Sequence, residues 1–456
     1  MGEKQRGSFS NKLGYVLAAA GASVGLGNIW RFPYLAAKYG GGVFILVYLI
    51  LVLTFGYTMI MAETTIGRIS GKSPVGAFKH FSKDKSNKVG GWLNAIIPLL
   101  IVSYYVVIGG WVCKYLYGFI IGLKSEMADP VFFDNFITDG KSTTFWFLVF
   151  TIATMAIIYN GVQNGIERVS KIMMPILVVL AVIICIYAMT REGAIEGVKY
   201  VLIPDPSRFS WAAVVAAMEQ MFYSLSIAMG ILITFGSYMK KDVSIEGTTT
   251  QVEIFDTLIA ILASLMIIPA VFAFYKEDAA NMLNAGTGLM FKTMPKIFDS
   301  MSMGGAIGTL FFVLVLFAAL TSAIALAESI VSTLEDEMHW GRQKSTIVTT
   351  FLILGMGIFS ALGYGPWALV KIIGMQFLDF FDFISNGVMM PIAAMCTCML
   401  IVRDVGVKAI ADEVMLDGMP FKRRKVFEFM IKYICPFFLA VILFCSVAST
   451  FGLIQI

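Results

Sequence analysis

Oxygen ligands for a cation are the chemistry that the residue pattern suggests most directly. The stretch 21–33 places Gly21, Gly25, Gly27, Asn28 and Arg31 in or near the middle of an otherwise apolar run. Glycine weakens a helix, and an unwound turn inside a membrane exposes N–H and C=O groups that hydrocarbon cannot satisfy. Such a turn is tolerated only where it lines a cavity, and there the freed carbonyl oxygens can hold a cation.

A second stretch, Ser-Leu-Ser-Ile-Ala-Met-Gly at 224–230, is also rich in small and polar residues. Taken alone, it is better explained by close packing between helices, where small residues are common. Two such stretches, five apolar runs apart, favour an inverted repeat of five helices whose first members are both discontinuous. That arrangement places substrate and ions near the bilayer midplane, between the two repeats.

Other polar residues inside apolar runs support a binding function. The hydroxyls of Thr321 and Ser322 could ligate a hard cation, or could bond back to their own helix. Ionisable residues within membrane spans are costly, and each is a functional candidate by default. For Glu328, exposure to a water-filled pathway on the cytoplasmic side explains the charge as well as a binding role does. The ionisable candidates are Glu63, Asp256, Glu328, Asp379 and Asp382.

Enzymatic chemistry is not indicated. The chain contains no Ser-His-Asp or Cys-His arrangement, and His80 and His339 lie in charged connecting segments. The Gly25-x-Gly27 pair lacks the strand and helix context of a nucleotide site. The six cysteines all lie in apolar runs, which favours buried small side chains over disulfides or a metal site. The net charge of +4 is too small to suggest a nucleic-acid partner.

The elements that must position these residues are membrane-spanning helices. The 456 residues are 58% hydrophobic and 14% charged, whereas soluble domains are about a quarter charged. About 20 apolar residues cross a bilayer as a helix. Eleven such runs are present and predict one all-α transmembrane domain over 1–456, with no soluble domain. The runs lie near 13–37, 42–66, 91–122, 144–160, 169–189, 211–238, 250–274, 304–334, 346–363, 368–402 and 430–454.

The distribution of Lys and Arg predicts the orientation. With the N-terminus inside, the inner loops, including the basic cluster 422–425, carry clearly more of these residues than the outer loops. The positive-inside rule then places the N-terminus in the cytoplasm, and eleven spans place the C-terminus outside. Short loops without an N-x-S/T acceptor site favour a prokaryotic plasma membrane. The apolar outer segment 275–300 is predicted to be a short helical hairpin that dips toward a vestibule.

The motifs also resemble a known family. Gly25-Leu-Gly-Asn-Ile-Trp-Arg-Phe-Pro-Tyr34, followed by Gly40-Gly-Gly-Val-Phe44, resembles the signature of the neurotransmitter:sodium symporter family, which has the LeuT fold. The match continues in order through Tyr104-Tyr105, 220–226, 320–322 and 334–337. This resemblance implies a 5+5 inverted repeat with discontinuous first and sixth helices. The repeats would cover about 12–190 and 208–402, with an additional span at about 428–454, as in some bacterial members.

Two sodium sites follow from the resemblance. The first would use the Ser23 carbonyl with Asn28, Ser224 and Asp256, together with the substrate carboxylate. The second would use backbone carbonyls and the two hydroxyls of the eighth span. Its members would be Gly21, Val24, Ala318, Thr321 and Ser322.

The resemblance also implies a substrate pocket for an amino acid. The substrate carboxylate would meet the N–H groups of Leu26 and Gly27 and the Tyr105 hydroxyl, and its ammonium the carbonyls around Ala22, Tyr223 and Ser226. The side-chain pocket would be lined by Ile101, Met229, Ser322 and Leu326, which predicts a neutral, mainly apolar α-amino acid. Tyr223 and Tyr105 would form a lid over it.

Gates on both sides of the pocket complete what the resemblance implies. Arg31 and Asp382 would form the outer gate. Glu63 would accept hydrogen bonds from the unwound sixth span. The inner gate would consist of Arg6, Ser237, Tyr238 and Asp336.

The predicted function is sodium-coupled import of neutral amino acids by alternating access. One alternative is a proton-coupled permease of the same fold, which would carry a fixed cation in place of the Thr321 and Ser322 site. Another is an amino-acid sensor that does not transport. The oligomeric state cannot be read from the sequence.

The resemblance further predicts that chloride is not required. In chloride-dependent members, an anion sits beside the first sodium, held partly by a serine one helical turn beyond an asparagine ligand. Here the corresponding residues are Asp256 and Ala260. A carboxylate supplies the negative charge covalently, and Ala260 has no hydroxyl to donate. The alternative is that Asp256 faces water or caps a loop near the start of its span. Glu253, three residues earlier, is a second acidic residue that could align with the asparagine position.

Overall fold

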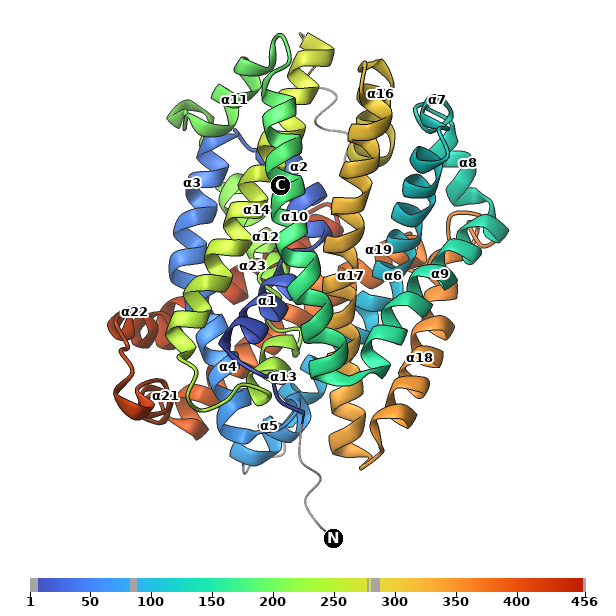
Figure 1. Cartoon of the computed structure of the whole chain (residues 1–456). Coiled ribbons are helices and arrows are strands. Elements are labelled where there is room, and N and C mark those ends of the chain that lie inside the picture. Colours follow the sequence, from blue (N-terminus) through green and yellow to red (C-terminus); the bar gives the residue numbers. More distant parts are fainter. Residues whose placement is uncertain (1–6, 83–87, 277–278, 280–287, 454–456) are drawn as a thin grey trace.

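A computed structural model describes residues 7–82, 88–276, 279 and 288–453, and this part of the chain is almost entirely helical (Figure 1). The only extended pairings within it are two isolated β-bridges, between Gly41 and Pro204 and between Ile372 and Met375. The all-α prediction is therefore confirmed.

Long helices, several containing π-helical turns, form the body of the molecule. In chain order they are α1 (Lys12–Ser23) with η1 (Gly27–Arg31) and α2 (Phe32–Lys38); α3 (Gly42–Leu51), η2 (Val52–Gly56) and α4 (Tyr57–Ser70); α6 (Lys88–Ile120); α9 (Gly140–Tyr159); η3 (Val162–Glu167) and α10 (Arg168–Met189); α12 (Trp211–Ser224) and α13 (Ile231–Ser237); α14 (Ile245–Tyr275); α17 (Gly304–Glu337); α18 (Arg342–Leu362); α19 (Phe377–Asp382), η7 (Phe383–Met389), α20 (Met390–Met399) and η8 (Leu400–Val405); and α22 (Arg424–Phe429), η10 (Met430–Ile434) and α23 (Cys435–Thr450).

Short helices lie in the connections. They are α5 (Pro74–Phe81), α7 (Lys124–Met127), α8 (Phe132–Thr138), α11 (Ala194–Leu202), η4 (Pro206–Arg208), η6 (Leu289–Thr293), α16 (Met294–Ser300), α21 (Val407–Val414) and η9 (Leu416–Gly418).

Nine helices of the described residues are long and apolar enough to cross a membrane, and ten if the bent pair at 12–38 counts as one span. The sixth predicted span is divided into α12 and α13, and neither part is long enough by itself. The count of eleven is reached only if this divided pair is added, so it stays a prediction.

Side-chain caps explain where several of these helices begin. Asn11 accepts a hydrogen bond from the Gly14 N–H at the start of α1, with N···O 2.9 Å. Ser210 caps α12 and Ser244 caps α14 in the same way. Each cap satisfies one of the backbone N–H groups that the first helical turn leaves without a partner.

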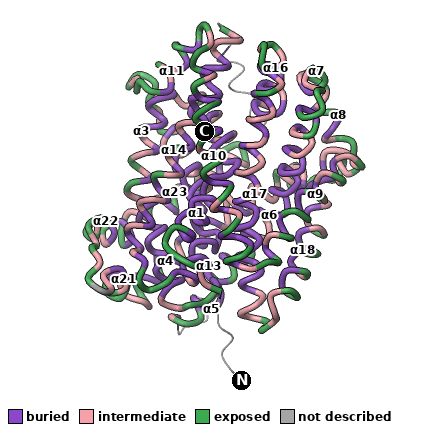
Figure 2. Tube along the Cα trace, in the orientation of Figure 1, coloured by how far each residue is buried: buried purple, intermediate pink, exposed green. Residues whose placement is uncertain are grey.

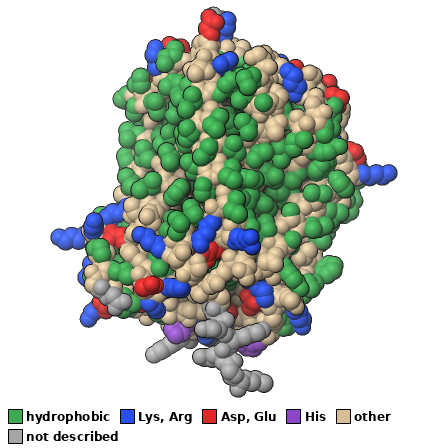
Figure 3. Space-filling view, viewed as in Figure 1, with side chains coloured by type: hydrophobic (Ala, Val, Ile, Leu, Met, Phe, Trp, Pro, Cys, Tyr) green, Lys and Arg blue, Asp and Glu red, His purple; other side chains and the backbone are tan. Residues whose placement is uncertain are grey.

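The spans pack around a buried centre and present an apolar exterior. Buried residues concentrate in the middle of the bundle (Figure 2), and a broad hydrophobic band covers the visible face with most Lys and Arg near its edges (Figure 3). The short helices α5, α21 and α22 lie toward one end, whereas α7, α8, α11 and α16 lie at the other (Figure 1). Segments predicted to be inner and outer loops thus occupy opposite ends.

The tenth predicted span, 368–402, begins later than expected. The helix starts at Phe377, and the preceding apolar segment forms turns in which Leu369 is 98% exposed. Gly374 lies within this segment and Gly363, Gly365 and Pro366 shortly precede it, and such residues favour turns over a continuous helix. Hydropathy alone extended the prediction too far.

The predicted hairpin at 275–300 is described only in part, because 277–278 and 280–287 lie outside the described residues. From Gly288 onward, the chain forms η6 and α16. Leu289, Met290 and Phe291 are buried, and the Phe291 carbonyl accepts a hydrogen bond from the Tyr115 hydroxyl at 2.7 Å.

Candidate functional site

The first helix is broken at its glycines. α1 ends at Ser23, Val24 is extended (ψ 96°), and the axis turns by 52° before the chain continues. A Cβ atom at Gly25 would lie 2.6 Å from the Ser322 Oγ, and one at Gly27 would lie 2.7 Å from a ring carbon of Tyr223. The glycines are therefore required because side chains from other helices approach the backbone closely at the break.

The second break separates α12 from α13 and is conformationally strained. Ser226 (φ 55°) and Ala228 (φ 58°) adopt the left-handed region that favours glycine, as does Gly230 (φ 69°). Each non-glycine residue in that region costs about 1–2 kcal/mol. The fully buried Glu63 offsets part of this cost, because its Oε1 accepts a hydrogen bond from the Ala228 N–H at 2.9 Å.

A small central cavity of about 20 Å³ lies between the two breaks. Nine of the ten predicted substrate residues line it, and Leu26 is the exception. Leu26 donates its N–H to the Tyr105 hydroxyl at 3.1 Å and lines a neighbouring cavity, here called the gate cavity, which also contains Arg31 and Asp382. A volume of 20 Å³ suffices for about one water molecule, so an amino acid requires side chains to move. The lining residues are Ala22, Ser23, Gly25, Gly27, Asn28, Ile101, Tyr105, Tyr223, Ser224, Ser226, Met229, Ile231, Ser322 and Leu326.

An acidic group of oxygens, here called the Asp256 cluster (Ser23, Asn28, Ser224 and Asp256), adjoins this cavity. Asp256 is fully buried, and its Oδ1 accepts hydrogen bonds from the Asn28 side-chain amide and the Ser224 hydroxyl, both at 2.7 Å. The idea that Asp256 faces water or caps a loop is wrong, because α14 begins eleven residues earlier, at Ile245. Three side chains predicted to share a sodium ion therefore lie in contact.

Hydroxyls and carbonyls gather on the other side of the first break. This Thr321–Ser322 cluster comprises the predicted set Gly21, Val24, Ala318, Thr321 and Ser322. The Ser322 hydroxyl lies 3.2, 3.1 and 3.3 Å from the carbonyl oxygens of Gly21, Ala22 and Val24. The Thr321 hydroxyl instead bonds back to Phe317 (2.9 Å) and Ala318 (3.2 Å) of its own helix. Hard oxygen ligands of this kind suit a hard cation.

Two polar contacts at the centre were not anticipated. The Tyr48 hydroxyl donates to the Asp256 Oδ2 at 2.7 Å, and the Gln220 amide donates to the Gly27 carbonyl at 3.0 Å. Tyr48 is fully buried within an apolar run, and a phenolic hydroxyl in such a place usually finds a partner. That rule could have marked Tyr48 as a candidate, although not its partner.

If the Asp256 cluster holds the predicted sodium ion, we expect Tyr48→Phe to weaken the apparent sodium affinity about tenfold. A hydrogen bond to a charged group contributes about 1.5–3 kcal/mol, and about 1.4 kcal/mol corresponds to a factor of ten. The measurement is the sodium dependence of uptake by the purified variant in proteoliposomes. Tyr117→Phe is the matched control, because Tyr117 is 47% exposed. An unchanged sodium dependence would show that Tyr48 does not position the carboxylate.

The gate cavity, of about 240 Å³, lies beyond Tyr223 and has Arg31 and Asp382 in its lining. Within the described part of the chain, the two residues form no ion pair with each other. Arg31 instead pairs with Glu219 of α12, with N···O 3.6 Å, and lies over the Tyr223 ring. Asp382 accepts hydrogen bonds from the Tyr104 hydroxyl (2.8 Å) and Asn386 (2.5 Å). The predicted pair thus shares a cavity without forming an ion pair. Glu219 was not identified from the sequence as the partner of Arg31.

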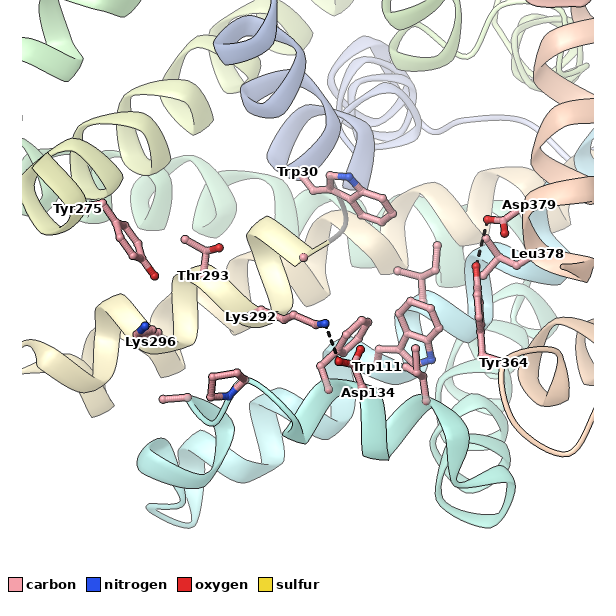
Figure 4. A pocket seen from close by; sticks show the side chains of 16 residues that line it. Trp30, Trp111, Asp134, Tyr275, Lys292, Thr293, Lys296, Tyr364, Leu378 and Asp379 are labelled. Carbon is pink, nitrogen blue, oxygen red and sulfur yellow. Dashed lines mark hydrogen bonds and ion pairs between the residues drawn. The ribbon is translucent and has the colours of Figure 1, made fainter. Parts of the chain in front are cut away.

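An outer cavity of about 560 Å³ adjoins the gate cavity through shared lining residues such as Trp30 and Leu378. Figure 4 shows Trp30, Trp111 and Tyr364 around it, with Lys292 paired to Asp134 at 2.7 Å. Tyr364 donates a hydrogen bond to Asp379 at 3.0 Å. Since Gly27 and Tyr223 line both the gate and central cavities, a series of cavities leads from this end of the molecule toward the breaks.

The opposite side of the centre is closed by an aromatic and ionic cluster. Phe9 is buried against the rings of Tyr15, Phe235 and Tyr238. The Tyr238 hydroxyl donates to Glu328 at 2.7 Å, and this buried carboxylate forms an ion pair with Arg342.

Two further predicted inner-gate residues, Asp336 and Ser237, are described by the structure. Asp336 accepts a hydrogen bond from the Ser73 N–H at 2.6 Å, and the Ser237 hydroxyl bonds to the Thr234 carbonyl at 2.5 Å. Arg6 lies outside the described residues. Glu328, whose place in a wet pathway was left open, is fully buried and paired.

Two helices broken at the centre of an apolar bundle, with cation-compatible oxygen clusters beside a small cavity, define the class of secondary membrane transporters. Comparison with known sequences specifies the family. A sequence model of the sodium:neurotransmitter symporter family matches residues 6–127 and 134–453. The chain belongs to this family, whose members are transporters, not enzymes.

Individual relatives agree with this assignment. The chain is 33% identical over 404 residues to the sodium-dependent transporter YhdH of Bacillus subtilis (strain 168), covering 88% of each chain. It is 25% identical to the human sodium- and chloride-dependent GABA transporter 2, covering 91% of this chain and 75% of the relative. The structure of MhsT in complex with L-phenylalanine matches with a TM-score of 0.87 and 37% identity, covering 97% of this chain and 100% of that one.

Proposed function

We propose that this protein imports neutral, mainly hydrophobic α-amino acids, coupled to Na⁺, by alternating access. The observation that carries the proposal is the central cavity, which brings nine predicted substrate residues together between two broken helices. Ile101, Met229, Ile231 and Leu326 supply apolar side chains around it. The similar protein MhsT is described in complex with L-phenylalanine, which fits an amino acid at this position.

The main-chain groups of the substrate would be held at the breaks. The Leu26 and Gly27 N–H groups and the Tyr105 hydroxyl suit the carboxylate, because backbone N–H groups freed at a helix break attract anions. The carbonyl of Ala22, which accepts the Ser226 hydroxyl at 3.1 Å, suits the ammonium. In this binding mode, the same main-chain contacts serve every α-amino acid, and the apolar wall selects the side chain.

Sodium would occupy both oxygen clusters. At the Asp256 cluster it would share the substrate carboxylate, which makes sodium and substrate binding mutually dependent. At the Thr321–Ser322 cluster it would join the first and eighth spans, α1 and α17. Because a ligand shifts a conformational equilibrium only through its different affinities for the two states, release of this second sodium inward would favour opening of the inner side. Chloride would not be required.

The family-based boundaries and orientation complete the proposal. The two repeats would cover about 12–190 and 208–402, with an additional span at about 428–454. The cluster of Lys and Arg at 422–425 supports a cytoplasmic location for the end that carries α5, α21 and α22. The protein would then reside in a prokaryotic plasma membrane, with its N-terminus inside and its C-terminus outside.

Uptake into proteoliposomes tests the proposal. We expect accumulation of labelled apolar amino acids when sodium is outside, and none when choline replaces it or a sodium ionophore removes the gradient. Competition by all twenty amino acids measures the specificity. Small or medium aliphatic amino acids are expected to compete strongly; stronger competition by aromatic amino acids would identify the alternative substrate class. Strong competition by lysine or glutamate alone would contradict the apolar pocket. Binding without uptake would identify a sensor, and accumulation driven by a proton gradient without sodium would identify the proton-coupled alternative.

A further inference from the structure

A large apolar groove, which shares no lining residue with the central cavity, lies on the side of the second and seventh spans. Its volume is about 880 Å³, against about 20 Å³ for the central cavity. We call it the α14 groove. Its walls come from α3, η2, α14 and the segment 420–423 that precedes the last span. Its apolar lining consists of Leu49, Val52, Leu53, Ile254, Leu258 and Ile261.

The groove has the length and position of a lipid chain. Its lining extends along α14 from Ser244 to Ile261, a rise of about 25 Å at 1.5 Å per residue. Half of a bilayer's hydrocarbon core is about 15 Å thick, and the headgroup layer adds to this. Ile254 and Leu258, which are 59% and 43% exposed, face outward along a helix apolar enough to span the membrane. The groove therefore follows the membrane-facing side of one leaflet.

Lys422 and Arg423 line the end of the groove near α22, the helix at the lower left of Figure 1. Arg423 is neutralised by Glu253, with N···O 2.8 Å, and Arg424 pairs with Glu428 at 2.7 Å. Lys422 and Lys425 are exposed and form no ion pair among the described residues. Lys422 lines the groove, and Lys425 follows three residues later in α22 (Arg424–Phe429), so one unpaired cation lies in this border and a second lies next to it in the chain.

The border is held rigidly in place. The buried Glu246 accepts hydrogen bonds from the backbone N–H groups of Lys422 (2.8 Å) and Arg423 (3.0 Å) and from the Tyr57 hydroxyl (2.9 Å). The Arg423 guanidinium also stacks 3.5 Å from the centre of the Tyr57 ring. A preorganised border loses little conformational freedom on binding, which favours a specific ligand.

A buried acceptor in the groove also lacks a partner. Glu253 is 2% exposed and lines the groove, and its Oε1 has no hydrogen-bond donor among the described residues. A buried carboxylate oxygen without a donor is unfavourable, so a ligand that supplies an O–H group would be bound more tightly.

We propose that the α14 groove binds an anionic glycerophospholipid whose headgroup carries a hydroxyl, with phosphatidylglycerol as the simplest example. One acyl chain fills the apolar lining, the phosphate lies at Lys422 and Lys425, and the headgroup hydroxyl donates to Glu253 Oε1. Basic pockets between spans on the cytoplasmic side are a common form of anionic lipid recognition. This site shares no lining residue with the central cavity and does not depend on the proposed transport activity.

Native mass spectrometry of the purified protein, titrated with defined lipids, tests the site. We expect phosphatidylglycerol to be retained about 30-fold more strongly than phosphatidylcholine of the same chain length, as two cations near an anionic headgroup would produce. Equal retention of the two lipids would show ordinary boundary lipid and overturn the proposal. Phosphatidylethanol, a phosphodiester with the same single charge but no headgroup hydroxyl, should bind more weakly than phosphatidylglycerol, and equal binding would overturn the role of Glu253.

Variants on the exposed border and wall locate the bound lipid. Lys422→Ala/Lys425→Ala should remove the preference for phosphatidylglycerol, whereas Leu258→Trp, which fills the groove, should reduce retention of both lipids. The matched control is Lys141→Ala/Lys344→Ala, which removes two exposed lysines outside the groove. If the control and the border variant lose the preference equally, the lipid recognises net charge and not this groove. Melting temperatures in detergent without lipid verify that every variant is folded.

Discussion

Substituting Asp256 by asparagine is expected to abolish sodium-driven uptake, by at least about 100-fold, whereas the wild type should transport equally well in gluconate and in chloride. Asp256 is fully buried and receives hydrogen bonds from Tyr48, Asn28 and Ser224. At about 4 Å, the attraction between unit charges is about 4 kcal/mol in a protein environment, against about 1 kcal/mol in water. Removing the charge would leave a sodium ion at this cluster without its nearest compensating anion.

The variant also loses hydrogen-bond complementarity. An asparagine offers one oxygen and one NH₂ group, so with its oxygen toward Asn28 and Ser224 the Tyr48 O–H loses its acceptor. A buried donor without an acceptor costs about 1–3 kcal/mol, which adds to the lost charge. Asp242→Asn is the matched control, because Asp242 is exposed in the loop before the same helix. A strong chloride requirement in the wild type, or full activity of the variant in gluconate, would overturn the assignment of Asp256 as a fixed counter-charge.

The breaks were predictable because they arise from local sequence. Glycine, asparagine and arginine in the middle of an apolar run conflict with a continuous lipid-facing helix, and the structure bends at that point. Polarity marked Thr321 and Ser322 as candidates but left open whether they bond back to their own helix; Thr321 does so, whereas Ser322 reaches the first break. Where the local signal was weaker, as in the turn-forming segment before Phe377, hydropathy overestimated the length of the helix.

Pairing between distant residues was not predictable from local sequence. Tyr48 and Asp256 are 208 residues apart, and nothing near either of them identifies the other. The choice of Glu219 over Asp382 as the partner of Arg31 depends on how α12 packs beside the first span. Family resemblance named Asp382, but it contains no information about an additional carboxylate such as Glu219. Such contacts require the packed structure.

Replacing Thr321 and Ser322 together by alanine is expected to eliminate sodium-driven accumulation, with a loss of at least about tenfold. The Ser322 hydroxyl lies within 3.3 Å of three carbonyl oxygens at the first break, and the Thr321 hydroxyl lies 3.2 Å from the Ala318 carbonyl. Two hydroxyls complete a shell of carbonyls that would otherwise offer sodium too few oxygen ligands. Uptake driven by a sodium gradient in proteoliposomes is the measurement.

The single variants separate the two functions that meet at this helix. Ser322 also lines the central cavity, so Ser322→Ala is expected to change both sodium and substrate dependence. Thr321 is not among the cavity-lining residues, and Thr321→Ala should raise the sodium concentration required for half-maximal uptake without changing the order of competing amino acids. A changed order in Thr321→Ala would show that its hydroxyl acts on the substrate and not on the ion.

The loss must also be distinguished from damage to the helix. Alanine has the highest helix propensity, so the double variant keeps α17 intact and loses only hydrogen bonds worth about 1 kcal/mol each. Thr309→Ala/Thr333→Ala is the matched control, because each of these hydroxyls bonds back to its own helix at 2.8 Å, away from the break. If the control keeps its uptake and the Thr321 and Ser322 variant loses it, the effect belongs to the oxygens that face the first span. Full uptake by the double variant would show that sodium coupling does not depend on this cluster.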